Sequence, residues 1–143
     1  MSNFLFAGLN LPVALWMVHF AGDLLAQNDW MAIQKSKRLD ALTLHVFIYT
    51  LTFMLYGILV GWTGEQVKLF GILTFYSHFL TDFFTSKISR RLFPWVPSGL
   101  SSKVYLDHEG IDGRSRHRFF VNLGADQLIH MITLALTYRL LVE

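Results

Sequence analysis

Long apolar stretches dominate this chain, and its charged residues are concentrated between them. The clearest stretch, residues 42–62, contains no Asp, Glu, Lys or Arg. Because about 20 apolar residues of helix cross the core of a bilayer, this length predicts a transmembrane helix. Three further stretches carry a few polar residues, and we predict spans at 9–25, 67–84 and 119–138. The pattern predicts an all-α fold: a four-helix transmembrane bundle that forms a single domain over residues 1–143.

Composition argues against the alternative of a soluble four-helix bundle. A soluble helix carries a charged outer face, and none of the four stretches does. Hydrophobic residues make up 53% of the chain and charged residues 15%, whereas about a quarter of an average soluble domain is charged. The chain has no cysteine, which excludes a disulfide framework, a zinc finger and a thiol nucleophile. Its net charge of +2 gives no indication of nucleic-acid binding.

The basic residues predict how the chain is oriented in a membrane. Loops 27–41 and 85–118 together contain 10 of the 12 Lys and Arg residues. Positively charged loops remain on the cytoplasmic side, so we expect both loops in the cytoplasm and both termini outside. Loop 85–118 is long for so small a protein, which is typical of a functional segment or a disordered one.

Ionisable residues inside the predicted spans form a second pattern. Such residues are costly in a bilayer and are usually functional. With depth taken at about 1.5 Å per helical residue, seven of them fall in the cytoplasmic half of the membrane. Six form His/Asp pairs four residues apart, which places each pair on one helix face. The seven are His19, Asp23, His45, His78, Asp82, Asp126 and His130.

Imidazoles and carboxylates gathered at one depth predict a metal site. Such nitrogen and oxygen donors suit Zn, Mn or Fe, and helical bundles build metal sites from residues on facing helices. We expect one or two ions, because paired metals are usual for phosphoester hydrolysis. The predicted ligands are His19, Asp23, His78, Asp82, Asp126 and His130.

Catalytic and substrate-binding roles follow from the same placement. Asp23 and Asp126 would bridge two metals, orient a histidine or activate water, and His45 would be a further catalytic or substrate-contacting group. The basic and amide residues nearest the cytoplasmic face would hold an anionic substrate or a lipid headgroup. These predicted substrate-binding residues are Gln27, Gln127, Lys35, Lys37 and Arg38.

The polar motifs as a set resemble a family of small bacterial and phage integral membrane proteins known only as a domain of unknown function. The matching motifs are HxxGDxxxQ from His19 to Gln27, HxxxD from His78 to Asp82, and DQxxH from Asp126 to His130. The stretch around His45 is also similar. The resemblance implies a multi-pass protein of the bacterial inner membrane or of a prophage, and it implies no reaction.

Three functional hypotheses follow. The first is a metal-dependent hydrolase that acts on a phosphoester or amide at the depth of the lipid headgroups. The second is a non-enzymatic membrane interaction module whose His/Asp pairs are polar contacts between helices. The third is an ion- or proton-conducting homo-oligomer. The first predicts that substitutions in the His/Asp cluster have the largest effect on function. The second predicts that substitutions in the cytoplasmic loops do. The third predicts that neighbouring copies supply a second polar layer.

Overall fold

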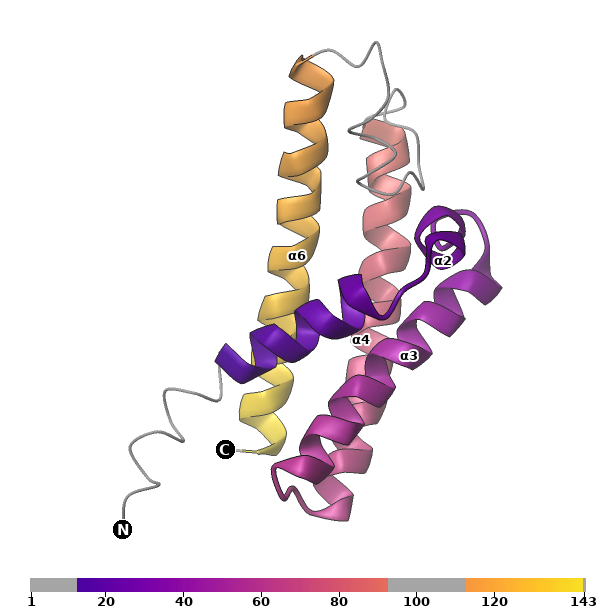
Figure 1. The fold of residues 1–143 in the computed structure, drawn as a ribbon. Coiled ribbons are helices and arrows are strands. Elements are labelled where there is room, and N and C mark those ends of the chain that lie inside the picture. The colour runs from indigo at the N-terminus through magenta and orange to yellow at the C-terminus, as the bar shows by residue number, and fades with distance from the viewer. Residues whose placement is uncertain (1–12, 93–112, 143) are drawn as a thin grey trace.

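The computed structural model describes residues 13–92 and 113–142, and every regular element within these ranges is a helix (Figure 1). The all-α prediction is therefore confirmed for this part of the chain. The described part of the chain begins with a helical segment, Val13–Leu25, whose last turn, η1 (Ala21–Leu25), is π-helical. The elements that follow are α2 (Asp29–Gln34), α3 (Leu39–Leu59), α4 (Gly64–Leu92) and α6 (Gly113–Leu141).

The helices continue beyond the predicted spans on the side of the long loops. Loop 27–41 contains α2, which begins where the Asn28 side chain accepts a hydrogen bond from the backbone N–H of Met31 at 2.9 Å. The prediction of a loop over 85–118 is wrong at both ends, because α4 runs to Leu92 and α6 begins at Gly113. Hydropathy marks where a membrane would end. A helix continues as long as its residues favour helical conformation, and Lys and Arg favour it.

At the opposite side the helices end closer to the predicted limits. α3 ends at Leu59, three residues before the predicted end of its span. Gly61 then adopts a φ of +84°, a left-handed conformation that glycine reaches without steric cost. The N–H of Trp62 bonds to the carbonyl of Gly57 at 2.9 Å, and the indole covers the surface of that glycine. This turn reverses the chain so that α4 packs along α3.

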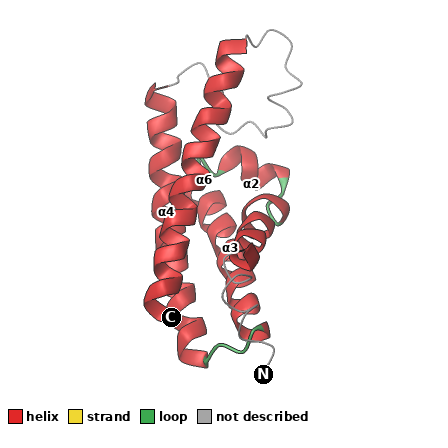
Figure 2. Cartoon of the chain, turned by 90° about the vertical axis from the view of Figure 1, so that its left-hand side faces the viewer, coloured by secondary structure: helices red, strands yellow, loops and turns green. Residues whose placement is uncertain are grey.

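The arrangement differs from four helices that run side by side. α4 and α6 lie against each other in opposite directions, and α3 packs on α4 (Figures 1 and 2). Segment Val13–Leu25 crosses this group obliquely, while α2 lies against the beginning of α3. Of the helices that the structure describes, α3 alone is long and apolar enough to span a membrane by itself. The four-span prediction is therefore not confirmed by helix length and composition.

The interior has two zones. At the end toward the turn between α3 and α4, buried apolar and aromatic side chains pack together, among them Leu15, Phe53, Phe70 and Leu134. At the end nearer α2, the buried side chains include histidines and aspartates as well as apolar residues. The outward faces of the helices, by contrast, carry many exposed large apolar residues, such as Phe47 on α3 and Tyr76 on α4. The molecule is therefore polar inside and apolar outside around the His/Asp zone.

Candidate metal centre

Four separate helical elements bring ionisable side chains to one buried point. Asp23 lies on the π turn η1, His45 on the second turn of α3, His78 and Asp82 on α4, and His130 on α6. Each of these residues exposes 5% of its surface or less. The i, i+4 spacing of the pair on α4 directs both side chains to the same face, as the sequence predicted.

The π turn accounts for the position of Asp23. The N–H of Ala26 bonds to the carbonyl of Ala21 at 2.9 Å, five residues earlier, so this turn holds more residues than an α-helical turn. Gly22 allows the turn to approach α3 closely, since a Cβ there would stand 2.6 Å from Thr52 Oγ1 and 3.0 Å from the Tyr49 ring. Asp23 is thereby brought into the interior against α3.

Four donor atoms form a compact group at the centre of the cluster. His45 Nε2 lies 3.1 Å from Asp23 Oδ1, 3.2 Å from His78 Nε2 and 3.4 Å from Asp82 Oδ2. His78 Nε2 lies 3.6 Å from Asp23 Oδ1 and 3.7 Å from Asp82 Oδ2. Two overlapping triads within this region have the donors and spacing to hold a metal ion: Asp23, His45 and His78, and His78, Asp82 and His130.

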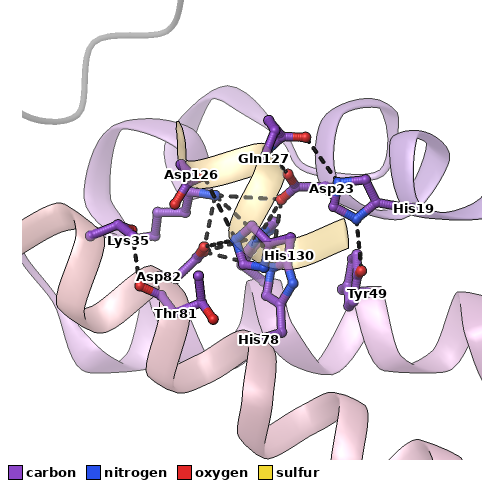
Figure 3. A network of polar contacts seen from close by, with 12 residues as sticks. His19, Asp23, Lys35, Tyr49, His78, Thr81, Asp82, Asp126, Gln127 and His130 are labelled. Carbon is purple, nitrogen blue, oxygen red and sulfur yellow. Dashed lines mark hydrogen bonds and ion pairs between the residues drawn. The ribbon is translucent and has the colours of Figure 1, made fainter. Parts of the chain in front are cut away.

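Lys35, which follows α2, turns inward and joins the cluster (Figure 3). Its Nζ lies 3.1 Å from Asp82 Oδ2, 3.1 Å from His45 Nε2 and 3.7 Å from Asp23 Oδ1. Burial acts to lower the pKa of the Lys35 ammonium, but the charges of Asp82 and Asp23 outweigh it and hold this pKa above its usual value. The ammonium therefore remains charged and partly neutralises the two carboxylates.

His130 and Asp126 extend the cluster along α6. His130 Nε2 lies 2.9 Å from Asp82 Oδ1 and 3.6 Å from Asp126 Oδ2. The side chain of Asp126 is 19% exposed, so this carboxylate stands at the edge of the buried region. Three carboxylates and one ammonium meet here, which leaves two negative charges when the histidines are neutral.

A hydrogen-bond relay holds the second carboxylate oxygen of Asp23, Oδ2. The side-chain amide of Gln127 donates to Asp23 Oδ2 at 2.7 Å, and its Oε1 accepts from His19 Nε2 at 2.9 Å. His19 Nδ1 then accepts from the Tyr49 hydroxyl at 2.7 Å. Both ring nitrogens of His19 are therefore engaged away from the four central donor atoms. The structure brings this predicted ligand beside the centre, outside both metal-competent triads.

A small cavity lies behind His78. It has a volume of about 10 Å³, at the lower limit of what admits one water molecule. His78 Nδ1 and Thr74 Oγ1 belong to residues that line it, and neither atom has a hydrogen-bond partner among the described residues. A polar contact at this nitrogen would fix the tautomer that leaves Nε2 free to bind a metal.

Two of the remaining predicted substrate residues lie at the surface. Lys37 and Arg38 are exposed, and Arg38 pairs with the exposed Asp40 at 2.7 Å. Gln27 is half-buried, and its Oε1 has no hydrogen-bond partner within the described ranges. Sequence reasoning placed Lys35 with these surface groups and did not single out Tyr49. The sequence does contain a signal for Tyr49. Tyr49 lies four residues after His45, so the two side chains share one helix face.

Comparison with known proteins supplies a family and no activity. The model of the family described as "Protein of unknown function (DUF3307)" matches residues 11–143, so the chain belongs to this family. The predicted membership of a family known only as a domain of unknown function is confirmed. No curated protein and no solved structure matches the chain. The function must therefore be argued from the cluster itself.

Proposed function

We propose that this DUF3307 protein is an integral membrane protein that binds a divalent transition metal inside its helical bundle. The ligands in this proposal are Asp23, His45, His78 and Asp82. The observation that carries it is the spacing of their four donor atoms. Ligands at about 2.0–2.1 Å from a tetrahedral zinc ion lie about 3.3–3.4 Å from one another. Five of the six separations among these atoms, all except the one between the two aspartates, range from 3.1 to 3.7 Å and bracket this value.

The crowding around His45 supports a shared cation. Its Nε2 lies within 3.1–3.2 Å of Lys35 Nζ, Asp23 Oδ1 and His78 Nε2. A ring nitrogen offers one proton or one lone pair, so hydrogen bonding alone satisfies only one of these three contacts. A metal ion would interact favourably with the nitrogen lone pairs and with both carboxylates. Its two positive charges would also offset the two negative charges of the ligands Asp23 and Asp82.

The surface supports a membrane location. Large apolar side chains are exposed along all the long helices, and a soluble monomer rarely exposes contiguous apolar patches of more than a few hundred Å². In our proposal α3, α4 and α6 cross the bilayer with these faces toward lipid. The segments around α2 and between α4 and α6 would lie in the cytoplasm, as their basic residues predict.

Hydrolysis of an ester or amide bond at the depth of the lipid headgroups is the reaction that we propose. Catalytic zinc sites commonly have three protein ligands and one water, and the metal lowers the pKa of that water to about 7. Three of the four proposed ligands, Asp23, His45 and His78, form a triad of two histidines and one aspartate, and in the reaction a water would take the place of Asp82. Lys35 and Asp126, with side chains 23% and 19% exposed, would face an approaching substrate. Lys35 would contact its anionic group, and Asp126 would accept a proton.

Polar packing without metal is the second candidate, and one observation favours it. Lys35 already pairs with both Asp23 and Asp82, so the cluster holds a cation of its own. Hydrogen bonds between membrane helices are individually worth roughly 0.6–2 kcal/mol and commonly serve as contacts. The ion-conducting oligomer stays a prediction, because it depends on contacts between copies.

Cobalt substitution separates the two candidates. The metal-free protein in detergent is titrated with Co²⁺, whose visible absorption is intense in tetrahedral sites and weak in octahedral ones. We expect intense bands that saturate at about one Co²⁺ per chain, as a single site requires. Asp82→Asn should abolish these bands, whereas the matched control Asp40→Asn, at an exposed aspartate, should preserve them. A folded protein that gives no tetrahedral spectrum would favour polar packing.

A further inference from the structure

The Lys35 ammonium lies in contact with the donor atoms of the proposed metal site. Its Nζ is 3.1–3.7 Å from three of the four donor atoms, the same range as the separations among those atoms. The ammonium thus covers the face formed by Asp23, His45 and Asp82. Figure 3 shows the lysine side chain directed toward Asp23 and Asp82.

The site cannot hold this ammonium and a metal ion at the same time without strong repulsion. A metal about 2 Å from each donor would lie only a few Å from Nζ. Like charges at that distance in a poorly hydrated interior repel strongly. Both cations also compete for the same oxygens, Asp23 Oδ1 and Asp82 Oδ2.

We propose that Lys35 is a built-in competing cation that occupies the carboxylates in the metal-free protein and leaves when the metal binds. This inference rests on the metal site proposed above. It assigns a regulatory role to the α2 segment, since metal uptake requires the lysine to move outward. The exchange would keep the buried carboxylates paired in both states, which limits the cost of an uncompensated buried charge.

The surroundings of Lys35 allow this movement. α2 has six residues, and Lys35 directly follows it at its carboxyl end. The lysine side chain is 23% exposed, whereas Asp23 and Asp82 are 3% and 5% exposed. Lysine has a flexible four-carbon stem, so its ammonium can turn to water without a change in α3 or α4. The exposed neighbour Lys37 shows that this part of the chain borders solvent.

The test compares the zinc affinity of Lys35→Met, Lys35→Arg and Lys37→Met with that of the wild type. Affinity is measured in detergent by competition with a chromophoric chelator. Lys35→Met removes the charge and keeps a side chain of similar length, and we expect it to bind Zn²⁺ roughly 10- to 100-fold more tightly, the scale of effects from groups around metal ligands. Lys35→Arg retains the charge, and Lys37→Met makes the same change at an exposed lysine. Both should stay close to the wild type.

A second measurement keeps the test decisive if metal-free Lys35→Met does not fold. The variant is then purified with Zn²⁺ bound, and the rate of zinc loss to excess chelator is compared with that of the loaded wild type. We expect slower loss. Zinc binding that is equal or weaker in Lys35→Met, or faster loss, would overturn the competing role and assign Lys35 to packing. If neither protein binds zinc, the proposed metal site itself is wrong.

Discussion

The relay from Gln127 to Asp23 gives a prediction that separates a metal ligand from a residue that positions one. Gln127→Leu keeps a side chain of similar size and removes both hydrogen bonds of the amide, at 2.7 Å to Asp23 Oδ2 and 2.9 Å from His19. Outer partners of ligating groups typically change metal affinity 10- to 100-fold. We therefore expect Gln127→Leu to weaken zinc binding by this factor, equivalent to about 1.4–2.7 kcal/mol.

The stability of the metal-free protein should fall as well. Hydrogen bonds to charged groups contribute about 1.5–3 kcal/mol, and neutral bonds about 0.5–1.5 kcal/mol. Because Gln127 is only half-buried, water can replace part of what the leucine removes, and we expect a net loss of about 2 kcal/mol. Gln66→Leu is the matched control for zinc affinity, which it should leave unchanged. Gln66 bonds to the carbonyl of Leu141, in the part of the molecule away from the cluster.

A double-mutant cycle with His19→Phe determines whether His19 acts through Gln127. If it does, the double variant should bind zinc about as weakly as Gln127→Leu alone, because both changes interrupt one relay. If His19 binds the metal directly, as the sequence suggested, His19→Phe should cost more than Gln127→Leu and the two losses should add. Zinc affinities from chelator competition supply all four corners of the cycle. Wild-type affinity in Gln127→Leu would refute the relay.

Two further predictions concern the membrane and the helix contacts. The chain has no cysteine, so Lys37→Cys and Thr63→Cys provide single labels at exposed positions. A membrane-impermeant maleimide should label Thr63→Cys in intact cells and Lys37→Cys only after lysis, whereas the reverse pattern would invert the topology. Gly22→Ala places a methyl group against α3 and should cost about 1–3 kcal/mol in thermal unfolding. Gly124→Ala, with nothing within 4 Å, should cost nothing, and equal effects would contradict the close contact.

The sequence predicted much of the cluster because helical spacing is regular. His78 and Asp82 share a face of α4 as expected, and His130 meets them from α6. His19 was harder to place, since Asp23 lies on a π turn that begins two residues after His19 and changes how the two side chains are related around the helix axis. Hydropathy and spacing contain no signal for such a turn.

Lys35 could not be placed from sequence for a different reason. A basic residue in a polar loop normally faces water, and charge counting assigns it to topology. Its inward position depends on α2, which begins at the Asn28 cap and turns the chain back toward the cluster. The ends of α4 and α6 were also missed, because the predicted limits followed hydropathy while the helices continue through polar residues.

Metal content tests the central claim most directly. Protein purified in detergent without a histidine tag, from cells grown without added metal, is measured by elemental analysis. We predict about one Zn, Mn or Fe per chain, as a single four-ligand site requires. Metal should be lost in His45→Ala and Asp82→Asn and retained in Asp40→Asn. A folded wild-type protein without metal, or metal retained in both cluster variants, would contradict the proposed site.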